Sequence, residues 1–156
     1  LLSTAHPGII YRRHWESSLP LVAADADLLK GILTNLLENA ADALERGGVI
    51  RVSASERASQ VEILVEDSGP GLSLLARETL FQPTISFKRS GMGLGLSIAK
   101  RSALLMSGDL ELVPSTLGGA AFLLRLPAAP FTPLESSWQN ESSSSTTKKT
   151  LAVRSA

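Results

Sequence analysis

Three groups of residues in this chain have types and spacing that could do chemistry, and the first lies in a stretch of helical pattern. Asn35, Asn39 and Asp42 follow one another at helical spacing and share one face, with Glu38 beside them. Asparagine is a mediocre helix former, so two on one face need a reason. Amide and carboxylate oxygens suit a hard cation such as magnesium. The alternative is a polar face that only meets water.

The second and third groups are rich in glycine. The turn Asp67-Ser68-Gly69-Pro70-Gly71 follows an apolar run, and Gly91-Met-Gly-Leu-Gly-Leu96 leads into a helical pattern. Glycine lets a ligand approach the backbone closely, and N–H groups at the start of a helix bind phosphate. Neither turn alone is specific. A dinucleotide-binding fingerprint fails because residue 96 is Leu, and a Walker A loop is absent because no lysine follows a glycine.

Hydrophobic periodicity indicates the elements that must position these groups. Helices are predicted over about 26–45, after an N-cap at Asp25 and before Gly47 and Gly48, over 76–80, and over 94–106. The core positions predicted in the last helix are Leu96, Ala99, Ala103, Leu104 and Met106. Strands are predicted over 8–15, 19–23, 49–54, 61–65, 109–113 and 121–126. Strands that come in adjacent pairs favour a mixed, mostly antiparallel sheet covered on one face by helices, an α/β two-layer sandwich.

Composition limits the partners and the number of domains. The 156 residues carry 15 basic and 15 acidic side chains, so no net field attracts nucleic acid or an anionic membrane. Cysteine is absent, which excludes disulfides and thiolate metal sites. The chain starts with Leu, and we expect a piece of something longer. We expect one domain over 1–127 and a flexible Ser/Thr-rich tail over 128–156.

The order of the motifs is more specific than any one of them. Asn35 to Ala40, the Asp67 turn, the run Leu80-Phe-Gln-Pro83 and the glycine turn at 91–95 occur in the order of the N, G1, F and G2 boxes. The chain therefore closely resembles the catalytic, ATP-binding domain of two-component sensor histidine kinases over roughly 9–127. Leu80 to Lys100 is most similar to kinases of the nitrogen-regulation and oxygen-sensing type.

The resemblance implies the Bergerat fold, with ATP and Mg²⁺ as cofactors. Asn39 would coordinate the magnesium, and Asn35 would line the phosphate region. Asp67 would accept a hydrogen bond from the adenine amino group. An ATP lid would span Phe81 to Ser90. The residues expected to take part in catalysis are Asn35, Glu38 and Asn39. The residues expected to contact the nucleotide are Asn35, Asn39, Asp42, Asp67, Gly69, Gly71, Phe81, Lys88, Gly91, Gly93, Leu94, Gly95 and Leu96.

Some positions depart from the family's pattern. Asp42 stands where many relatives have a basic residue, which gives Lys88 or Arg89 more importance for phosphate binding. Thr84 replaces the second phenylalanine of the F box, and Gly119-Ala120 replaces Gly-Thr.

The resemblance also implies partners. Neither His6, which precedes Pro7, nor His14, at the end of a predicted strand, suits a phosphoacceptor. The expected partners are therefore an upstream dimerisation domain that bears the acceptor histidine and, through the full-length kinase, a response regulator. The expected location is cytoplasmic, as part of a kinase that could itself be membrane-bound.

Two alternatives remain open. Related ATPases of the gyrase, chaperone and mismatch-repair kind use a glutamate four residues before the magnesium asparagine, where this chain has Asn35, although Glu38 lies nearby. A nucleotide-binding regulatory module without turnover is the other.

Overall fold

The fold is built on a five-stranded mixed sheet, described by a computed structural model for residues 6–83 and 94–130. The strands are β1 (Ile9–Trp15), β2 (Gly48–Arg57), β3 (Gln60–Asp67), β4 (Asp109–Val113) and β5 (Ala121–Pro127). Their order across the sheet is β1-β2-β3-β5-β4. Only β1 and β2 pair in parallel, and the other three pairs are antiparallel. This confirms the predicted mixed, mostly antiparallel sheet.

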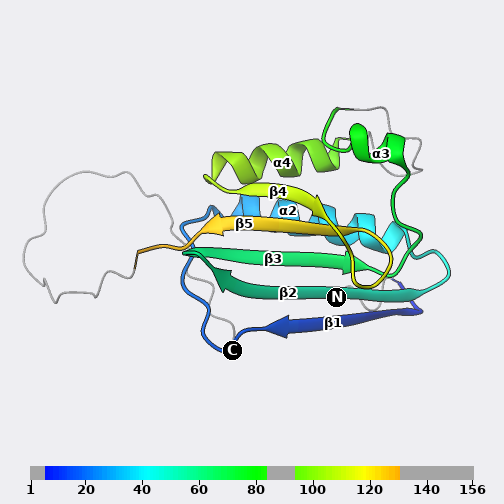
Figure 1. Ribbon diagram of the computed structural model, residues 1–156, viewed down its shortest axis with the longest axis horizontal. Coiled ribbons are helices and arrows are strands. Elements are labelled where there is room, and N and C mark those ends of the chain that lie inside the picture. The colour runs from blue at the N-terminus through cyan, green and yellow to red at the C-terminus, as the bar shows by residue number, and fades with distance from the viewer. Residues whose placement is uncertain (1–5, 84–93, 131–156) are drawn as a thin grey trace, which may run out of the picture.

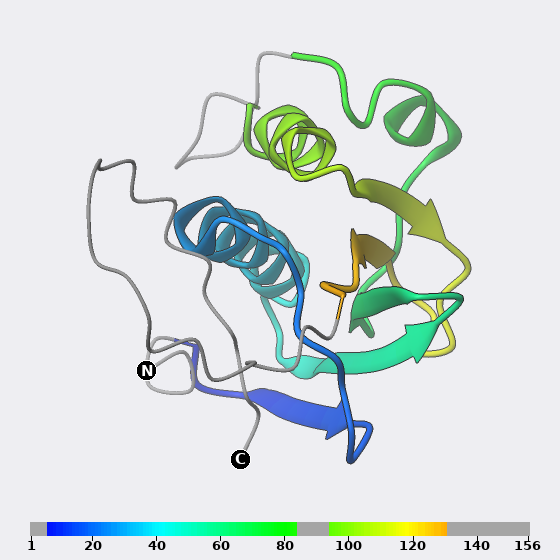
Figure 2. The same cartoon turned by 90° about the vertical axis from the view of Figure 1, so that its left-hand side faces the viewer.

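Two helices cover one face of this sheet, and no helix of the described residues covers the other, which is called the open face here (Figures 1 and 2). They are α2 (Ala26–Asp42) and α4 (Gly95–Leu105), which lie side by side, while the short α3 (Leu74–Glu78) lies beyond α4 at the edge. The arrangement is the predicted two-layer sandwich. In the part of the chain that the structure describes, no helix is both long and apolar enough to cross a membrane.

The long helix α2 begins and ends where the sequence provides signals. The Asp25 side chain accepts hydrogen bonds from the backbone N–H groups of Asp27 and Leu28, at 2.9 and 3.0 Å, and so caps the helix. The helix ends at Asp42, three residues earlier than predicted, and a turn continues to Gly47 at φ +88°. Its apolar face buries Ile32, Leu36, Ala40 and Ala41 against the sheet and α4.

The shorter helix α4 packs through small side chains. Ala99 and Ala103 are fully buried, and Ser102 is buried beside them. The prediction of Leu104 as a core residue is wrong, because Leu104 is 55% exposed. The alanines let α4 approach α2 and the sheet closely, so the buried face of α4 is narrow and Leu104 lies outside it.

The predicted strand over 19–23 does not form. In its place, a single antiparallel bridge joins Val22 to Ala128, and Ala129 N–H donates to the Leu21 carbonyl. Strand β1 pairs instead with β2, in parallel. Two parallel strands need a crossover of a dozen or more residues, and the segment that contains α2 provides it. The backbone pairing at Ala129 also continues past the predicted domain boundary at 127, while the predicted flexible tail beyond residue 130 lies outside the described residues.

Candidate functional site

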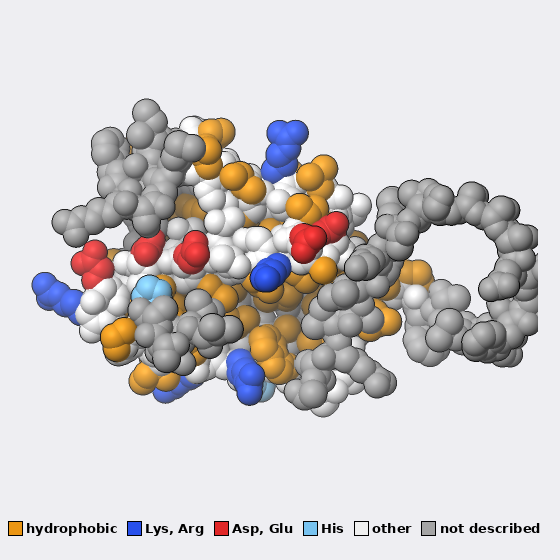
Figure 3. Space-filling view, turned by 180° about the vertical axis from the view of Figure 1, so that it is seen from behind, with side chains coloured by type: hydrophobic (Ala, Val, Ile, Leu, Met, Phe, Trp, Pro, Cys, Tyr) orange, Lys and Arg blue, Asp and Glu red, His pale blue; other side chains and the backbone are white. Residues whose placement is uncertain are grey.

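The polar face of α2 is the first part of the site. Asn35 and Asn39 are half-buried, while Glu38 and Asp42 are exposed. The neighbouring positions Leu36 and Ala40 are buried, so the pattern of α2 fixes which side chains face away from the core. Acidic side chains form a row over α2 in the view of the helix-covered side (Figure 3). A triphosphate bound along this face would need added positive charge.

The start of α4 lies directly against this polar face. A Cβ atom built on Gly95 would stand 2.8 Å from Oδ1 of Asn35, so glycine is what permits the close approach. The N-cap residue of α4, Leu94, makes no side-chain capping bond. Leu94 therefore gives the first N–H groups of α4 no side-chain acceptor, and these groups lie next to Asn35, in the place where a helix N-terminus binds an anion. Leu94 and Leu96 are both half-buried.

The Asp67 turn is the second part of the site. Asp67 is the last residue of β3 and is 3% exposed. Its Oδ1 atom accepts hydrogen bonds from the backbone N–H of Gly69 at 2.8 Å and of Ala120 at 3.3 Å. Gly71 has φ +75°, a conformation that favours glycine. These bonds fix the orientation of a buried carboxylate beside a turn whose backbone can lie close to a ligand.

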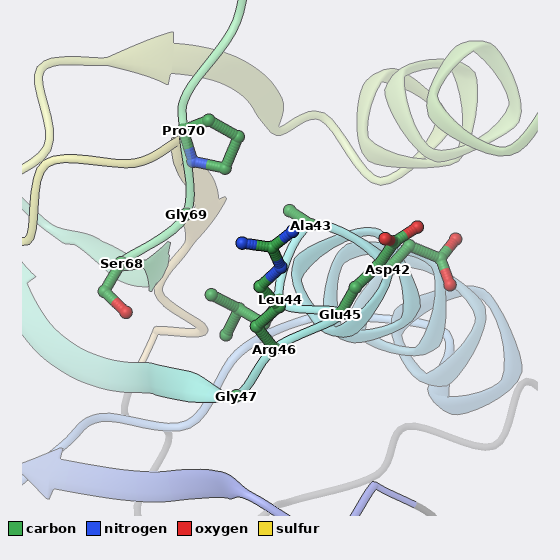
Figure 4. A pocket seen from close by; sticks show the side chains of 9 residues that line it. All are labelled: Asp42, Ala43, Leu44, Glu45, Arg46, Gly47, Ser68, Gly69 and Pro70. Atoms are coloured by element: carbon green, nitrogen blue, oxygen red, sulfur yellow. The ribbon is translucent and has the colours of Figure 1, made fainter.

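A pocket of 620 Å³ separates the end of α2 from this turn (Figure 4). Asp42 and Ala43 line it on the helix side, and Ser68, Gly69 and Pro70 line it on the other. Of the predicted site residues, only Asp42 and Gly69 are among its lining residues. Arg46 also lines the pocket, and its guanidinium group lies beside Ala43 in Figure 4. Sequence reasoning missed this cation because the residues after the helix follow no motif.

Phe81 belongs to the packing of α4. The ammonium Nζ of Lys100 lies 5.2 Å from the centre of the Phe81 ring, within the range of a cation–π contact. Lys100 also donates hydrogen bonds to Oδ1 of Asp109 at 2.5 Å and to the Leu110 carbonyl at 2.9 Å. Its hydrogen bond holds the pKa of the Asp109 carboxyl below the usual value. Phe81 and α4 are thereby joined to β4.

Sequence reasoning also missed a buried carboxylate next to Asp67. Glu66 is 1% exposed and is paired with Arg51 and Thr116 on the open face of the sheet. Burial raises the pKa of its carboxyl, but hydrogen bonds from the Thr116 backbone and from Arg51 outweigh burial and hold that pKa below 4.5. The available signal was a charged residue inside an apolar strand pattern, facing Arg51 across the predicted hairpin.

The remaining predicted site residues, Lys88, Gly91 and Gly93, lie outside the described residues, as does most of the predicted lid. Among the described residues, no group of three or more His, Cys, Asp or Glu side chains could hold a metal ion. A bound nucleotide could supply the other ligands of a magnesium ion at this site. Magnesium is usually held in this way, through one or two protein oxygens and substrate phosphates. The oxygen atoms on the polar face of α2 fit such an ion.

Comparison with known proteins gives a consistent result. Residues 24–130 match the family model described as histidine kinase-, DNA gyrase B- and HSP90-like ATPase. The signal transduction histidine-protein kinase AtoS of Escherichia coli K12 is 36% identical over 116 residues, which cover 74% of this chain and 19% of AtoS. The C4-dicarboxylate transport sensor protein DctS of Rhodobacter capsulatus is 34% identical, over 72% of this chain and 18% of DctS. The chain thus spans about a fifth of the length of these curated relatives.

Solved structures agree with the sequence relatives. The mycobacterial sensor histidine kinase MprB superposes with a TM-score of 0.71 at 25% identity, over 83% of this chain and 90% of the MprB chain. The full-length ShkA structure in complex with AMPPNP gives 0.67 at 30% identity, over 82% of this chain and 28% of ShkA.

Proposed function

This chain belongs to the family of histidine kinase-, DNA gyrase B- and HSP90-like ATPases, and we propose that it transfers the γ-phosphoryl group of ATP to a histidine on a separate dimerisation domain. Its relatives are sensor histidine kinases, so it is the ATP-binding catalytic domain of that type. The acceptor histidine, the dimerisation domain and a response regulator belong to the proposal. His14 lies in β1 and His6 precedes that strand, so neither is on a helix of the structure.

One observation supports the proposal: the polar face of α2 extends from the start of α4 to the Asp67 turn. Asn35 meets Gly95 at the start of α4, and Ala43, just past the helix end, meets Gly69 beside Asp67. From Asn35 to Asp42 the helix rises about 10 Å. An extended nucleotide fits this span with its base beside Asp67 and its phosphates beside the start of α4.

Each residue then has a role in the transfer. The Asp67 carboxylate accepts the adenine amino hydrogen, and Gly69 and Gly71 let the base approach the backbone. The N–H groups of α4 and the Asn35 amide bind the phosphates. The amide oxygen of Asn39 would hold Mg²⁺, which would neutralise charge on the phosphates. Phosphoryl transfer needs positioning and charge neutralisation more than covalent chemistry by the protein, and this set of residues supplies both.

The residue at position 35 distinguishes this proposal from ATP hydrolysis. The related hydrolytic enzymes place a glutamate at the position of Asn35, whose amide cannot accept a proton from water. Glu38 is exposed on α2, and Glu38→Gln tests whether it takes part in any hydrolysis. The finer likeness to nitrogen-regulation kinases stays a prediction.

The test pairs the chain with a dimerisation domain from its own full-length kinase and measures phosphotransfer and ATP affinity separately. Asn39→Ala should lower the transfer rate by about 100–1,000-fold, by analogy with the loss of one group that stabilises the transition state. Nucleotide affinity should fall much less, because the contacts of Asp67 and its turn do not involve the metal. Thr34→Ala, at an exposed position of the same helix, is the matched control. Transfer by Asn39→Ala at the wild-type rate, or no ATP binding by the wild type, would contradict the proposal.

A further inference from the structure

Two neighbouring carboxylates at the end of β3 hold the same loop from opposite sides of the sheet. This loop, residues 114–120, joins β4 to β5 and is called here the β4–β5 loop. We propose that Glu66 is a positioning residue for the nucleotide base: it anchors the β4–β5 loop, and the loop backbone in turn helps to set the orientation of the Asp67 carboxylate. The inference rests on the proposed function, which places adenine at Asp67.

The first half of this linkage is the hold of Glu66 on the loop. Oε1 of Glu66 accepts hydrogen bonds from the backbone N–H of Thr116 at 3.0 Å and from its hydroxyl at 3.2 Å. Oε2 accepts from Nε and Nη2 of Arg51, at 3.0 and 2.5 Å. The Arg51 guanidinium also donates to the Thr116 hydroxyl. Three residues far apart in the sequence thus form one closed network around a carboxylate that is 1% exposed.

The second half is the hold of the loop on Asp67. Gly119 N–H donates to the Asp67 backbone carbonyl at 3.1 Å, and Asp67 N–H donates to the Ala120 carbonyl at 3.0 Å. Ala120 N–H donates to Oδ1 of Asp67. A Cβ atom on Gly119 would overlap Oδ1 of Asp67, so the loop backbone is pressed against the carboxylate.

A chemical consequence follows from this geometry. Gly69 N–H, from the Asp67 turn, and Ala120 N–H, from the β4–β5 loop, both engage Oδ1, so the loop shares with the turn the control of where the rest of the Asp67 carboxylate points. A hydrogen bond weakens steeply when its angle departs from linearity, so a small shift of the loop would weaken the bond to an adenine amino group. The same shift would affect a guanine base less, because guanine has a carbonyl where adenine has the amino group. Loss of the Glu66 network should therefore reduce base selectivity and not merely affinity.

The strand provides a matched control for this idea. Glu62 is on the same strand and the same face, four residues before Glu66, and pairs with Arg125 at 3.1 Å. Its bonds reach neighbouring strands and not the β4–β5 loop. Glu62→Gln thus removes a paired charge from the open face and leaves the β4–β5 loop anchored. Glu66→Gln also removes a paired charge from that face, but it loosens the loop.

The experiment measures the dissociation constants of ATP and GTP for the full chain with magnesium, in wild type, Glu66→Gln, Thr116→Val and Glu62→Gln. The ratio of the two constants reports base selectivity, which a merely structural role would not change. Glu66→Gln and Thr116→Val should weaken ATP binding by about 3–10-fold, the range of one hydrogen bond, with GTP binding little changed. Glu62→Gln should leave the ratio at its wild-type value.

The outcomes separate this inference from the proposed function. Equal loss of ATP and GTP binding in Glu66→Gln, or the same change in Glu62→Gln, overturns the role of Glu66 while the ATP site stands. A wild type that does not prefer ATP over GTP overturns the base pocket at Asp67 and the inference with it. Should Glu66→Gln fail to fold, Thr116→Val decides, because it keeps the loop's backbone bond and loses only the hydroxyl.

Discussion

The two faces of the sheet are stabilised by different means. On the covered face, Ile50, Val65 and Leu124 are 0–1% exposed and pack under Ile32 and Leu36 of α2. On the open face, which Figure 1 shows in front of α2, ion pairs cross the strands. They join Arg51 to Glu66, Arg57 to Glu62, and Arg125 to both Glu62 and Glu111. An antiparallel sheet can leave one face in water in this way.

The two faces therefore contribute differently to folding and to binding specificity. Apolar burial on the covered face supplies most of the free energy, since each fully buried large side chain contributes about 1.5–3 kcal/mol. Exposed ion pairs contribute about 1 kcal/mol or less, so the open face can carry charges for other purposes. Glu66 is the exception on that face because it is buried and holds a loop. The largest effects of substitution should therefore lie on the covered face, and they should decrease across the sheet.

The comparison predicts its largest effect at Leu36, which is fully buried between α2 and the sheet. Leu36→Ala should lower the free energy of unfolding by about 2–5 kcal/mol, because it removes apolar contacts and leaves a cavity. Urea denaturation measures this change. Leu104→Ala, at a leucine that is 55% exposed on α4, should change it by less than about 0.5 kcal/mol. A similar loss of unfolding free energy in both variants would mean that burial does not explain the difference between the two positions.

The next effect concerns nucleotide binding at Asp67, the last residue of β3. Asp67→Asn keeps the shape of the side chain and an oxygen for the N–H groups of Gly69 and Ala120, but loses the charge. A charge-assisted hydrogen bond to the adenine amino group is worth about 1.5–3 kcal/mol, so ATP binding should weaken by a large part of that amount. GTP binding should weaken much less. Calorimetric titration with both nucleotides measures the difference, and an unchanged affinity for ATP would remove Asp67 from the base pocket.

The sequence predicted the parts of the molecule that depend on local pattern. The long helix, the hairpin of β2 and β3, and the closing strands β4 and β5 were all predicted within a few residues of their bounds. Their apolar periods and caps lie within each segment, and local burial and capping decide them. The motifs at Asn35, Asp67 and Gly95 were likewise visible, since the resemblance to a family depends on their order.

What could not be predicted depends on contacts between distant segments. The parallel pairing of β1 with β2 needs the crossover of α2, whereas the sequence suggested that strands 8–15 and 19–23 form one of several adjacent pairs. Glu66 is a charge at the end of an apolar strand pattern, and one of the two residues that pair it when buried, Thr116, lies 50 residues later. Leu104 has the spacing of a core residue, but the narrow alanine face of α4 excludes it. Tertiary packing overrides local pattern in all three.

The acid sensitivity of the open face should come mainly from Glu66. Its pKa is lowered in the folded chain, so it stabilises the fold above its unfolded pKa near 4.5, and this stabilisation is lost as the pH falls through the lower folded value. The unfolding free energy of the wild type should therefore decrease more steeply below pH 4.5 than that of Glu66→Gln. Asp109, whose pKa is also lowered, will add a decrease common to both proteins. Parallel curves for the two proteins would show that Glu66 does not titrate with folding.

A small effect is expected at Arg125, although it makes two ion pairs. Arg125 bonds to Glu62 at 3.1 Å and to Glu111 at 2.5 Å, but its side chain is 31% exposed and that of Glu111 is 43% exposed. When Arg125→Met removes the charge, water can solvate Glu111, and Glu62 keeps the nearby Arg57. No buried charge is left without a partner, so the unfolding free energy should fall by about 1 kcal/mol or less, and less still at high salt.

Arg51→Met provides the contrast, because it leaves Glu66 buried with only Thr116 to bond it, and breaking a buried pair costs more. Urea denaturation of both variants at low and high salt measures this difference. Equal costs would mean that the burial of Glu66 does not distinguish it from the other carboxylates of the open face.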